Sequence, residues 1–174
     1  MSNVATRFAP SPTGALHIGG VRTALFNWLF SKNQKGTFHL RIEDTDKERS
    51  KDEHRIQIIK SLKWIGIEHD GEEYIQSTKI DDHIKVANDL LKTGNAYKCY
   101  CSSEEIEEQK KRARQKKLPY IYSRKCRDLS EAETPKDIKP VIRFKSKIDG
   151  STVLKDLVQG DVEIDNNTIE DFII

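Results

Sequence analysis

Residues 7–20 read RFAPSPTGALHIGG, and the rest of the predicted fold follows from this stretch. A short apolar run stops at Pro10 and Pro12, and a helical pattern begins near His17, which is typical of a strand, a loop and the start of a helix. The prolines fix φ and hold the residues before them extended, so we expect a stiff loop. The glycines of the stretch remove side-chain bulk where a ligand must come close to the backbone. Unpaired N–H groups at the start of the helix favour an anion, most naturally a phosphate.

The segments on either side of this loop predict a parallel βαβ unit. Residues 4–9 are expected to form a strand, a helix follows to about Ser31, and residues 37–42 alternate as a second strand. Parallel βαβ units bind their ligand at the carboxyl ends of the strands, where residues 10–14 and 43–44 would both lie. The sequence therefore predicts a site assembled from two loops.

The rest of the chain is expected to add helices and then short strands. Apolar residues recur at helical spacing in residues 55–65 and 80–91, which predicts two amphipathic packing helices. Short strands separated by turn residues are expected at 141–146, 151–158, 160–165 and 168–174.

Residues 99–117 have a different character, with a serine cap, acidic residues first, basic residues last and almost no apolar face. They predict a solvent-exposed helix stabilised by its dipole and by pairs such as Glu107 with Lys111. Most of residues 110–117 are basic. This run either contacts an RNA backbone or is a solvated face.

The composition limits the class of protein. A chain of 174 residues suits one domain, or one domain and part of another. Its 30 Lys and Arg residues nearly balance its 28 Asp and Glu residues, so the net charge of +2 argues neither for nor against nucleic acid. Because there is no secretory signal and no apolar run long enough to span a bilayer, we expect a soluble cytoplasmic protein with no membrane partner. Its three cysteines suit a metal site better than a disulfide framework.

Four blocks in order, RFAPSPTG, LHIGG, RTALFNWLF and RIEDTDKER, resemble the bacterial glutamyl branch of the class I aminoacyl-tRNA synthetases. Residues 17–20 are similar to the HIGH signature of that class with glycine in the last place, which leaves His17 and backbone N–H groups for the phosphates. The resemblance implies an α/β Rossmann-like nucleotide-binding fold in residues 1–97 and part of an α+β connective insertion in residues 98–174. It also implies a monomeric ligase that activates glutamate with ATP and transfers it to the 3′-terminal adenosine of tRNA.

The resemblance also implies what is missing. No lysine loop similar to the KMSKS motif of the class occurs, and the last residues, 172–174, read as part of a strand. We therefore expect the N-terminal part of a longer synthetase, with a partial active site.

The resemblance gives individual residues roles at the two-loop site. The expected ATP contacts are Thr13, His17, Gly19 and Gly20, with His17 as the catalytic residue and Mg²⁺ carried by the nucleotide. The expected glutamate contacts are Arg7, Ala9, Ser11 and Glu43, since a guanidinium fork matches a carboxylate and an acid matches the ammonium group. The expected tRNA contacts are Asp44 and Arg49.

Structural roles are open alternatives for several of these residues. Thr13 could be only a turn residue. Arg7 and Glu43 could form an ion pair between neighbouring strands. Either Asp44 or Asp46 could cap the next helix.

A metal site is indicated by Cys99-x-Cys101 followed by Tyr122-x₃-Cys126-x-Asp128, which resembles the zinc pattern of some glutamyl enzymes. Two thiolates one residue apart can both reach one ion, and zinc favours four ligands. The fourth ligand would be Asp128, where a histidine sometimes stands, or Tyr122. The alternative is three unlinked cysteines.

Two other functions are open at this stage. One is the truncated paralogue, a glutamyl-queuosine tRNA synthetase-like enzyme that glutamylates a modified tRNA base, although RTALFNWLF and IEDTDKER argue against it. The other is a non-catalytic nucleotide- or RNA-binding module that keeps the fold but not the reaction.

Overall fold

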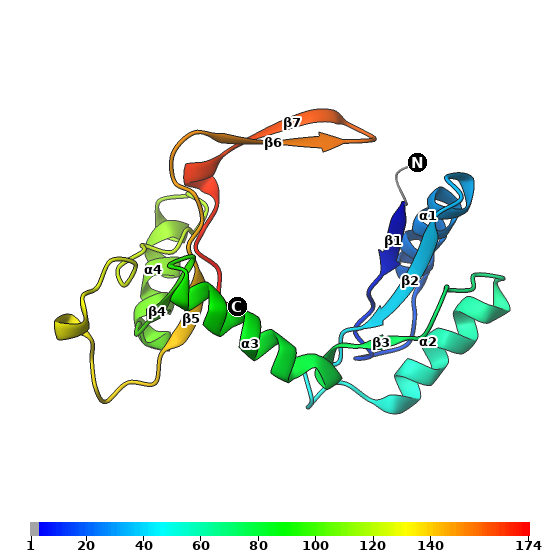
Figure 1. Ribbon diagram of the computed structural model, residues 1–174, viewed down its shortest axis with the longest axis horizontal. Helices are drawn as coiled ribbons and strands as arrows, with labels where there is room; N and C mark the ends of the chain where they lie inside the picture. Colours follow the sequence, from blue (N-terminus) through cyan, green and yellow to red (C-terminus); the bar gives the residue numbers. More distant parts are fainter. Residues whose placement is uncertain (1–3) are drawn as a thin grey trace. The chain divides into compact units, whose positions relative to one another are not determined.

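The computed structural model describes residues 4–174, which divide into two compact units after Asp82 (Figure 1). The first unit ends at Asp82 and the second begins at His83. The boundary expected between residues 97 and 98, which separates the nucleotide-binding fold from the connective insertion, stays a prediction.

The first unit is built on a three-stranded parallel sheet (Figure 1). The strands β1 and β2 pair in parallel from Ala5 opposite Thr37 to Phe8 opposite Leu40, which confirms the expected βαβ unit. The strand β3 was not predicted, because two residues carry no periodicity. The elements of the unit are β1 (Ala5–Phe8), α1 (Ile18–Asn33), β2 (Thr37–Ile42), α2 (Asp52–Trp64) and β3 (Tyr74–Ile75).

The two faces of this sheet differ in burial. Alternate residues of β2 point to opposite faces, and Phe38, Leu40 and Ile42 are fully buried. They form one core with Ala24 of α1 and Ile58 of α2, so both helices cover this face. The other face presents three basic side chains, those of Arg7, His39 and Arg41, beside a hollow of ≈ 450 Å³.

The turn between α1 and β2 depends on Gly36. The Thr37 N–H donates to the Val4 carbonyl oxygen at 2.9 Å and so joins the turn to β1. A Cβ atom at Gly36 would lie 2.1 Å from that oxygen. Only glycine therefore lets the backbone pass this close to β1.

The second unit holds a two-stranded antiparallel sheet and a separate hairpin (Figure 1). Strand β4 was not predicted, and α3 begins at Ile80, just before the division between the units. The elements are α3 (Ile80–Lys92), β4 (Ala96–Cys99), α4 (Ser103–Gln115), β5 (Val141–Phe144), β6 (Ser151–Asp156) and β7 (Gly160–Asp165).

The strand predicted at 168–174 is wrong. Residues 166–168 form a 3-10 helix capped by the Asp165 side chain. The last residues then pair with β5 at one isolated bridge, Arg143 with Ile173, where the Phe144 N–H donates to the Phe172 carbonyl at 2.9 Å and the Ile174 N–H donates to the Ile142 carbonyl at 3.0 Å. Asp171, in the middle of the segment, is fully buried, and its side chain accepts hydrogen bonds from other parts of the unit. Pairing with β5 is therefore confined to the end of the segment, and side-chain contacts hold the part before it.

The outcomes for the helices differ. Helix α4 has the predicted serine cap, with Ser102 and Glu105 forming a capping box, but Glu107 pairs with Arg114 instead of Lys111. Helix α2 buries Ile58 and Leu62 as expected. Helix α3 is confirmed at Ile80–Lys92, but none of its residues is fully buried within residues 4–174, where Ala87, Leu90 and Leu91 are half-buried. No helix among the described residues combines the length and the apolarity needed to cross a membrane.

Candidate functional site

Two backbone hydrogen bonds join the loops that follow β1 and β2. The Glu43 N–H donates to the Pro10 carbonyl at 3.0 Å, and the Lys51 N–H donates to the Pro12 carbonyl at 3.0 Å. Pro12 is fully buried, so the loop of prolines is fixed by packing as well as by its own stiffness. The structure confirms that the carboxyl ends of the two strands meet in one place.

His17 is the N-cap of α1. Its Nδ1 atom accepts a hydrogen bond from the Gly19 N–H at 3.1 Å, and its carbonyl accepts from the Val21 N–H at 3.1 Å. Because Nδ1 accepts, the neutral imidazole carries its proton on Nε2. The exposed ring therefore offers an N–H donor beside the start of the helix.

The glycines of this region are not equivalent. A Cβ atom at Gly19 would lie 2.8 Å from Cε1 of His17, and one at Gly20 would lie 2.8 Å from the end of the Leu16 side chain. A Cβ atom at Gly14 would meet nothing within 4 Å in the described chain. Gly19 therefore makes room for the His17 ring, whereas no neighbour in residues 4–174 requires glycine at 14.

The charged side chains at the ends of β1 and β2 pair differently from the expected alternative. Glu43 forms an ion pair with Arg41, two residues earlier in the chain and on the same face. Among residues 4–174, Arg7 has no ion-pair partner, so the predicted alternative of an Arg7–Glu43 pair is wrong. Arg41 was not among the predicted site residues, although the strict alternation of β2 places it on the face of Arg7.

The acidic residues after Glu43 have structural partners. Both carboxylate oxygens of Asp44 accept from Ser77, one from its N–H at 2.8 Å and one from its hydroxyl at 2.6 Å. Asp46 accepts from the Arg49 side chain at 2.6 Å and from the Arg49 N–H at 3.2 Å. Neither caps α2, whose N-cap is Lys51, so that alternative is wrong. The Arg49 side chain is 74% exposed.

The remaining predicted contacts lie on the first loop. Ser11 and Thr13 are exposed, and Ala9 is half-buried. Their roles as glutamate and ATP contacts stay predictions.

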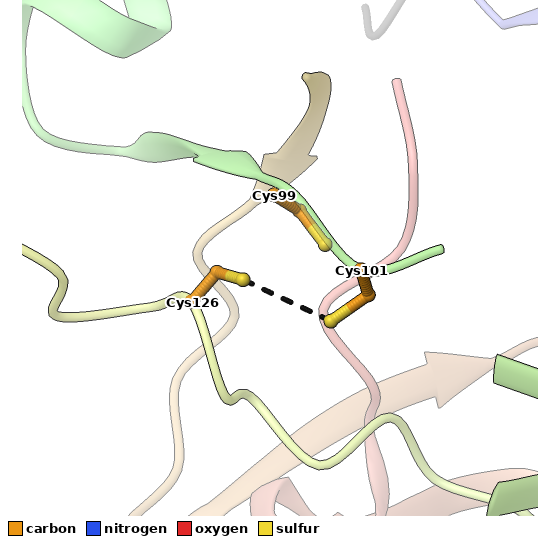
Figure 2. Close-up of side chains that lie close together, drawn as sticks. All are labelled: Cys99, Cys101 and Cys126. Carbon is orange, nitrogen blue, oxygen red and sulfur yellow. Dashed lines mark hydrogen bonds between the residues drawn. The ribbon is translucent and has the colours of Figure 1, made fainter. Parts of the chain in front are cut away.

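The second unit brings the three thiols together (Figure 2). Cys99 ends β4, Cys101 follows it, and Cys126 comes from a later loop. All three Sγ atoms lie within 4.8 Å of one another, with Cys101 and Cys126 3.8 Å apart. The structure therefore brings the three predicted cysteines together, and their sharing of one ion stays a prediction.

Tyr122 rather than Asp128 lies with the thiols. The Tyr122 hydroxyl is 3.2 Å from Cys99 Sγ and 3.3 Å from Cys101 Sγ, and the residue is buried. Asp128 has an 81% exposed side chain that pairs with Lys145 at 3.1 Å. The structure does not bring Asp128 into the cysteine cluster.

The surroundings of the cluster shift the pKa values of Cys99, Cys101 and Tyr122 in different directions. Burial favours the neutral thiol of Cys99, but the Tyr122 hydroxyl, the Cys101 N–H and the Arg143 guanidinium together hold its pKa below the ordinary value. Burial raises the pKa of Cys101 to about 11, against the opposing effect of Tyr122. Burial and the neighbouring sulfurs raise the pKa of Tyr122 well above its usual range. Cys99 therefore ionises more easily than Cys101.

Comparison with known proteins identifies the family. Residues 3–174 match the family described as tRNA synthetases class I (E and Q), catalytic domain. The chain belongs to this family.

Its relatives within the class I synthetases are glutamate–tRNA ligases. The chain is 84% identical over 174 residues to glutamate–tRNA ligase of Pelagibacter ubique, a match that covers 100% of this chain and 37% of that protein. It is 50% identical over 178 residues to glutamate–tRNA ligase 1 of Caldanaerobacter subterraneus subsp. tengcongensis, again covering 100% of this chain and 37% of that protein. This synthetase chain thus spans well under half the length of these relatives.

Solved structures agree with the fold. A crystal structure of a glutamate tRNA ligase from Elizabethkingia meningosepticum, in complex with its amino acid, superposes with a TM-score of 0.81 at 34% identity and covers 99% of this chain and 38% of that chain. Glutamate-tRNA synthetase from Elizabethkingia anophelis gives a TM-score of 0.82 at 34% identity, covering 99% of this chain and 39% of that chain. The α/β Rossmann-like fold of the class I synthetases is therefore the fold of this chain.

Proposed function

We propose that this chain is the part of a glutamate–tRNA ligase that binds ATP and glutamate and begins their reaction. One observation carries the proposal: the guanidinium of Arg7, which has no ion-pair partner among residues 4–174, the carboxylate of Glu43 and the His17 end of α1 belong to loops and strand ends that meet at one edge of the parallel sheet. The 84% identity to a glutamate–tRNA ligase supports it.

The reaction needs two anions held together. The carboxylate of glutamate attacks the α-phosphorus of ATP, pyrophosphate leaves with the electrons of the broken P–O bond, and glutamyl-adenylate remains. The Nε2 proton of His17 is a donor for the negative charge that grows on the phosphate oxygens. Mg²⁺ bound to the nucleotide would neutralise part of the charge on its phosphates. Gly20, Gly19 and Thr13 complete the proposed nucleotide contacts.

Glutamate recognition is proposed for Arg7, Ala9, Ser11 and Glu43. Arg7 would hold the side-chain carboxylate through a bidentate pair, for which its lack of another ion-pair partner among residues 4–174 is favourable. Glu43 would receive the ammonium group while Arg41 fixes its carboxylate from the other side.

Transfer to tRNA is proposed to involve the loop that follows β2. Arg49 is the more accessible contact, since its side chain is 74% exposed. Asp44, the second proposed contact, is already engaged with Ser77, so it also shapes the loop that tRNA would meet.

A zinc ion is proposed at Cys99, Cys101 and Cys126. Tetrahedral zinc with sulfur at about 2.3 Å sets its sulfur atoms about 3.8 Å apart, and Cys101 and Cys126 lie 3.8 Å apart. Tyr122 is the better-placed fourth ligand, because Asp128 points elsewhere. When bound, the ion would link β4 to the loop that carries Cys126 and would take no part in the glutamate chemistry.

The test is exchange of pyrophosphate into ATP by the full-length gene product, with glutamate and tRNA present. We expect glutamate-dependent exchange, followed by esterification of tRNA. Absence of exchange would leave a non-catalytic nucleotide- or RNA-binding module. A tRNA from which the 3′-terminal adenosine has been removed should accept no glutamate. If it still does, the acceptor is a base and the paralogue is the correct assignment.

A further inference from the structure

We propose that Asp171 is a positioning residue for the cysteine cluster, which it serves by tying together the strand that carries Cys99 and the loop that carries Cys126. The inference rests on the metal site advanced under Proposed function. It concerns a residue about 45 positions after Cys126, in a segment that the sequence pattern assigned to a strand.

Asp171 holds the Cys126 loop directly. Its two carboxylate oxygens accept from the Arg127 Nη1 at 2.8 and 2.7 Å, and Arg127 is the residue after Cys126. Arg127 also donates from Nη2 to the Ser146 carbonyl at 2.8 Å. The guanidinium next to the cysteine is therefore fixed from both of its ends.

The residues beside Asp171 hold the same loop. The Ile169 carbonyl accepts from Arg124 at 2.8 Å, and a Glu170 carboxylate oxygen accepts from the Tyr122 N–H at 3.2 Å. Residues 169–171 thus contact the loop on both sides of Cys126. A loop of this kind has no ladder of its own to fix its shape, so these contacts set the position of its thiol and hydroxyl.

Asp171 also reaches the other half of the cluster. The Tyr97 hydroxyl donates to Asp171 at 2.8 Å, and Tyr97 lies two residues before Cys99 on β4. The Asp171 carbonyl accepts from Arg143 of β5 at 2.7 Å, and the Arg143 guanidinium stacks on the Tyr122 ring with its carbon 3.8 Å from the ring centre. One residue therefore connects β4, β5 and the loop.

The burial of Asp171 makes this connection rigid. The residue is 0% exposed, and its carboxylate receives Arg127, Tyr97 and the Ser146 N–H at 3.1 Å, with Arg124 Nε 3.6 Å away. A buried carboxylate with this many donors has one favourable position. Removal of its charge leaves the Arg127 guanidinium, whose side chain is only 12% exposed, without its counter-charge, so the loop must shift.

The experiment uses the full-length protein purified with zinc. Asp171→Asn keeps the size of the side chain but removes the charge, and we expect it to release zinc to a chromogenic chelator about 10- to 100-fold faster, the range for groups that orient metal ligands. Asp128→Asn is the matched control, because this exposed carboxylate lies two residues after Cys126 and outside the network. The control should release zinc at the wild-type rate.

Cobalt(II) gives a readout that general destabilisation would not move. With cobalt in place of zinc, Asp171→Asn should change the visible bands of the bound ion in the still-folded protein, since these bands report ligand geometry. If Asp171→Asn does not fold, Tyr97→Phe and Arg127→Lys each remove one part of the network, and both should hasten zinc release.

The outcomes separate the two proposals. Wild-type protein without zinc, with thiols that titrate freely, would overturn the metal site and this inference with it. If the wild-type protein holds zinc but Asp171→Asn changes neither the rate of zinc release nor the cobalt spectrum, only the role of Asp171 is overturned. If Asp171→Asn does not fold, the same result in both Tyr97→Phe and Arg127→Lys overturns that role.

Discussion

At the scale of single residues, His17 combines two tasks in one ring. Nδ1 caps α1 through the Gly19 N–H, and this leaves the Nε2 proton as the donor toward phosphate. His17→Asn should separate the tasks, because asparagine is also a good N-cap but lacks the imidazole. We expect kcat for pyrophosphate exchange to fall about 10²-fold or more in the full-length enzyme, with unchanged thermal stability. Near-normal exchange would remove His17 from the mechanism.

Gly19 provides an independent test of the same ring. Gly19→Ala places a Cβ atom 2.8 Å from the His17 ring, so the ring must move although His17 is still present. The exchange rate should fall in Gly19→Ala nearly as far as in His17→Asn. In Gly20→Ala the only close approach of the new atom among the described residues is 2.8 Å to the flexible end of Leu16, with the Phe8 ring at an ordinary 3.6 Å, and the loss should be smaller. Equal losses in the two alanine variants would contradict the role given to the ring.

Arg7 is expected to act on glutamate and not on ATP. Arg7→Ala should raise the KM for glutamate about ten- to a hundredfold, the value of a charge-assisted bidentate pair of roughly 1.5–3 kcal/mol, while the KM for ATP stays close to that of the wild type. Arg7→Lys is the matched control, since it keeps the charge and loses the bidentate guanidinium. Its KM for glutamate should lie between those of the wild type and Arg7→Ala. A parallel rise in both KM values would indicate that Arg7 supports the sheet instead.

At the scale of elements, the turn from α1 to β2 is fixed by the absence of a side chain at Gly36. Gly36→Ala should lower the free energy of unfolding by about 1–3 kcal/mol, because a Cβ atom there collides with the Val4 carbonyl that pairs β1 with the turn. Gly14→Ala, where the added atom meets nothing within 4 Å, should leave stability unchanged. Urea unfolding of both variants measures the difference, and equal midpoints would refute the argument.

The sequence predicted the helices and strands that have a local residue pattern. It did not predict contacts that depend on residues far away in the chain. The alternation of 37–42 and the helical spacing after His17 gave the βαβ unit, because burial of one face dictates both patterns. The sequence did not predict the hydrogen bonds from Ser77 to Asp44, 33 residues earlier, since no local pattern marks a side chain that accepts from a distant residue. The same is true of the segment around Asp171, whose apolar and acidic letters resemble a strand.

The candidate site was predictable for a different reason. Loop residues that bind a ligand carry little periodicity, so composition alone would have left them as a turn. The ordered sequence blocks and the expected meeting of two strand ends indicated which loop residues form the candidate site. They did not indicate which charged side chains of that site pair with each other. Arg41 rather than Arg7 pairs with Glu43, because Arg41 lies two residues before Glu43 at the end of β2, whereas Arg7 lies on another strand.

At the scale of the whole molecule, the chain consists of two compact units with separate cores. The first core contains Phe38 and Ile58, and the second contains Tyr97, Tyr122 and the thiols; no residue of one cluster belongs to the other. The proposed metal belongs to the second core alone. Stability of the two units should therefore respond separately to removal of zinc.

The last prediction follows from this separation. A chelator, or Cys126→Ser, should remove zinc from the full-length protein and increase amide hydrogen exchange from about Tyr97 to Asp128, because free energy of metal binding contributes to folding of the region that supplies the ligands. Amides of β1 and β2 should keep their protection, since their ladder and core lie wholly in the first unit. Tyr122→Phe should weaken zinc retention, whereas Asp128→Asn should not, because only Tyr122 lies beside the thiols. Loss of protection in β1 and β2 on chelation would show that the units depend on each other. Unchanged exchange near Tyr122 would show that the cysteine cluster does not hold its region together through a metal.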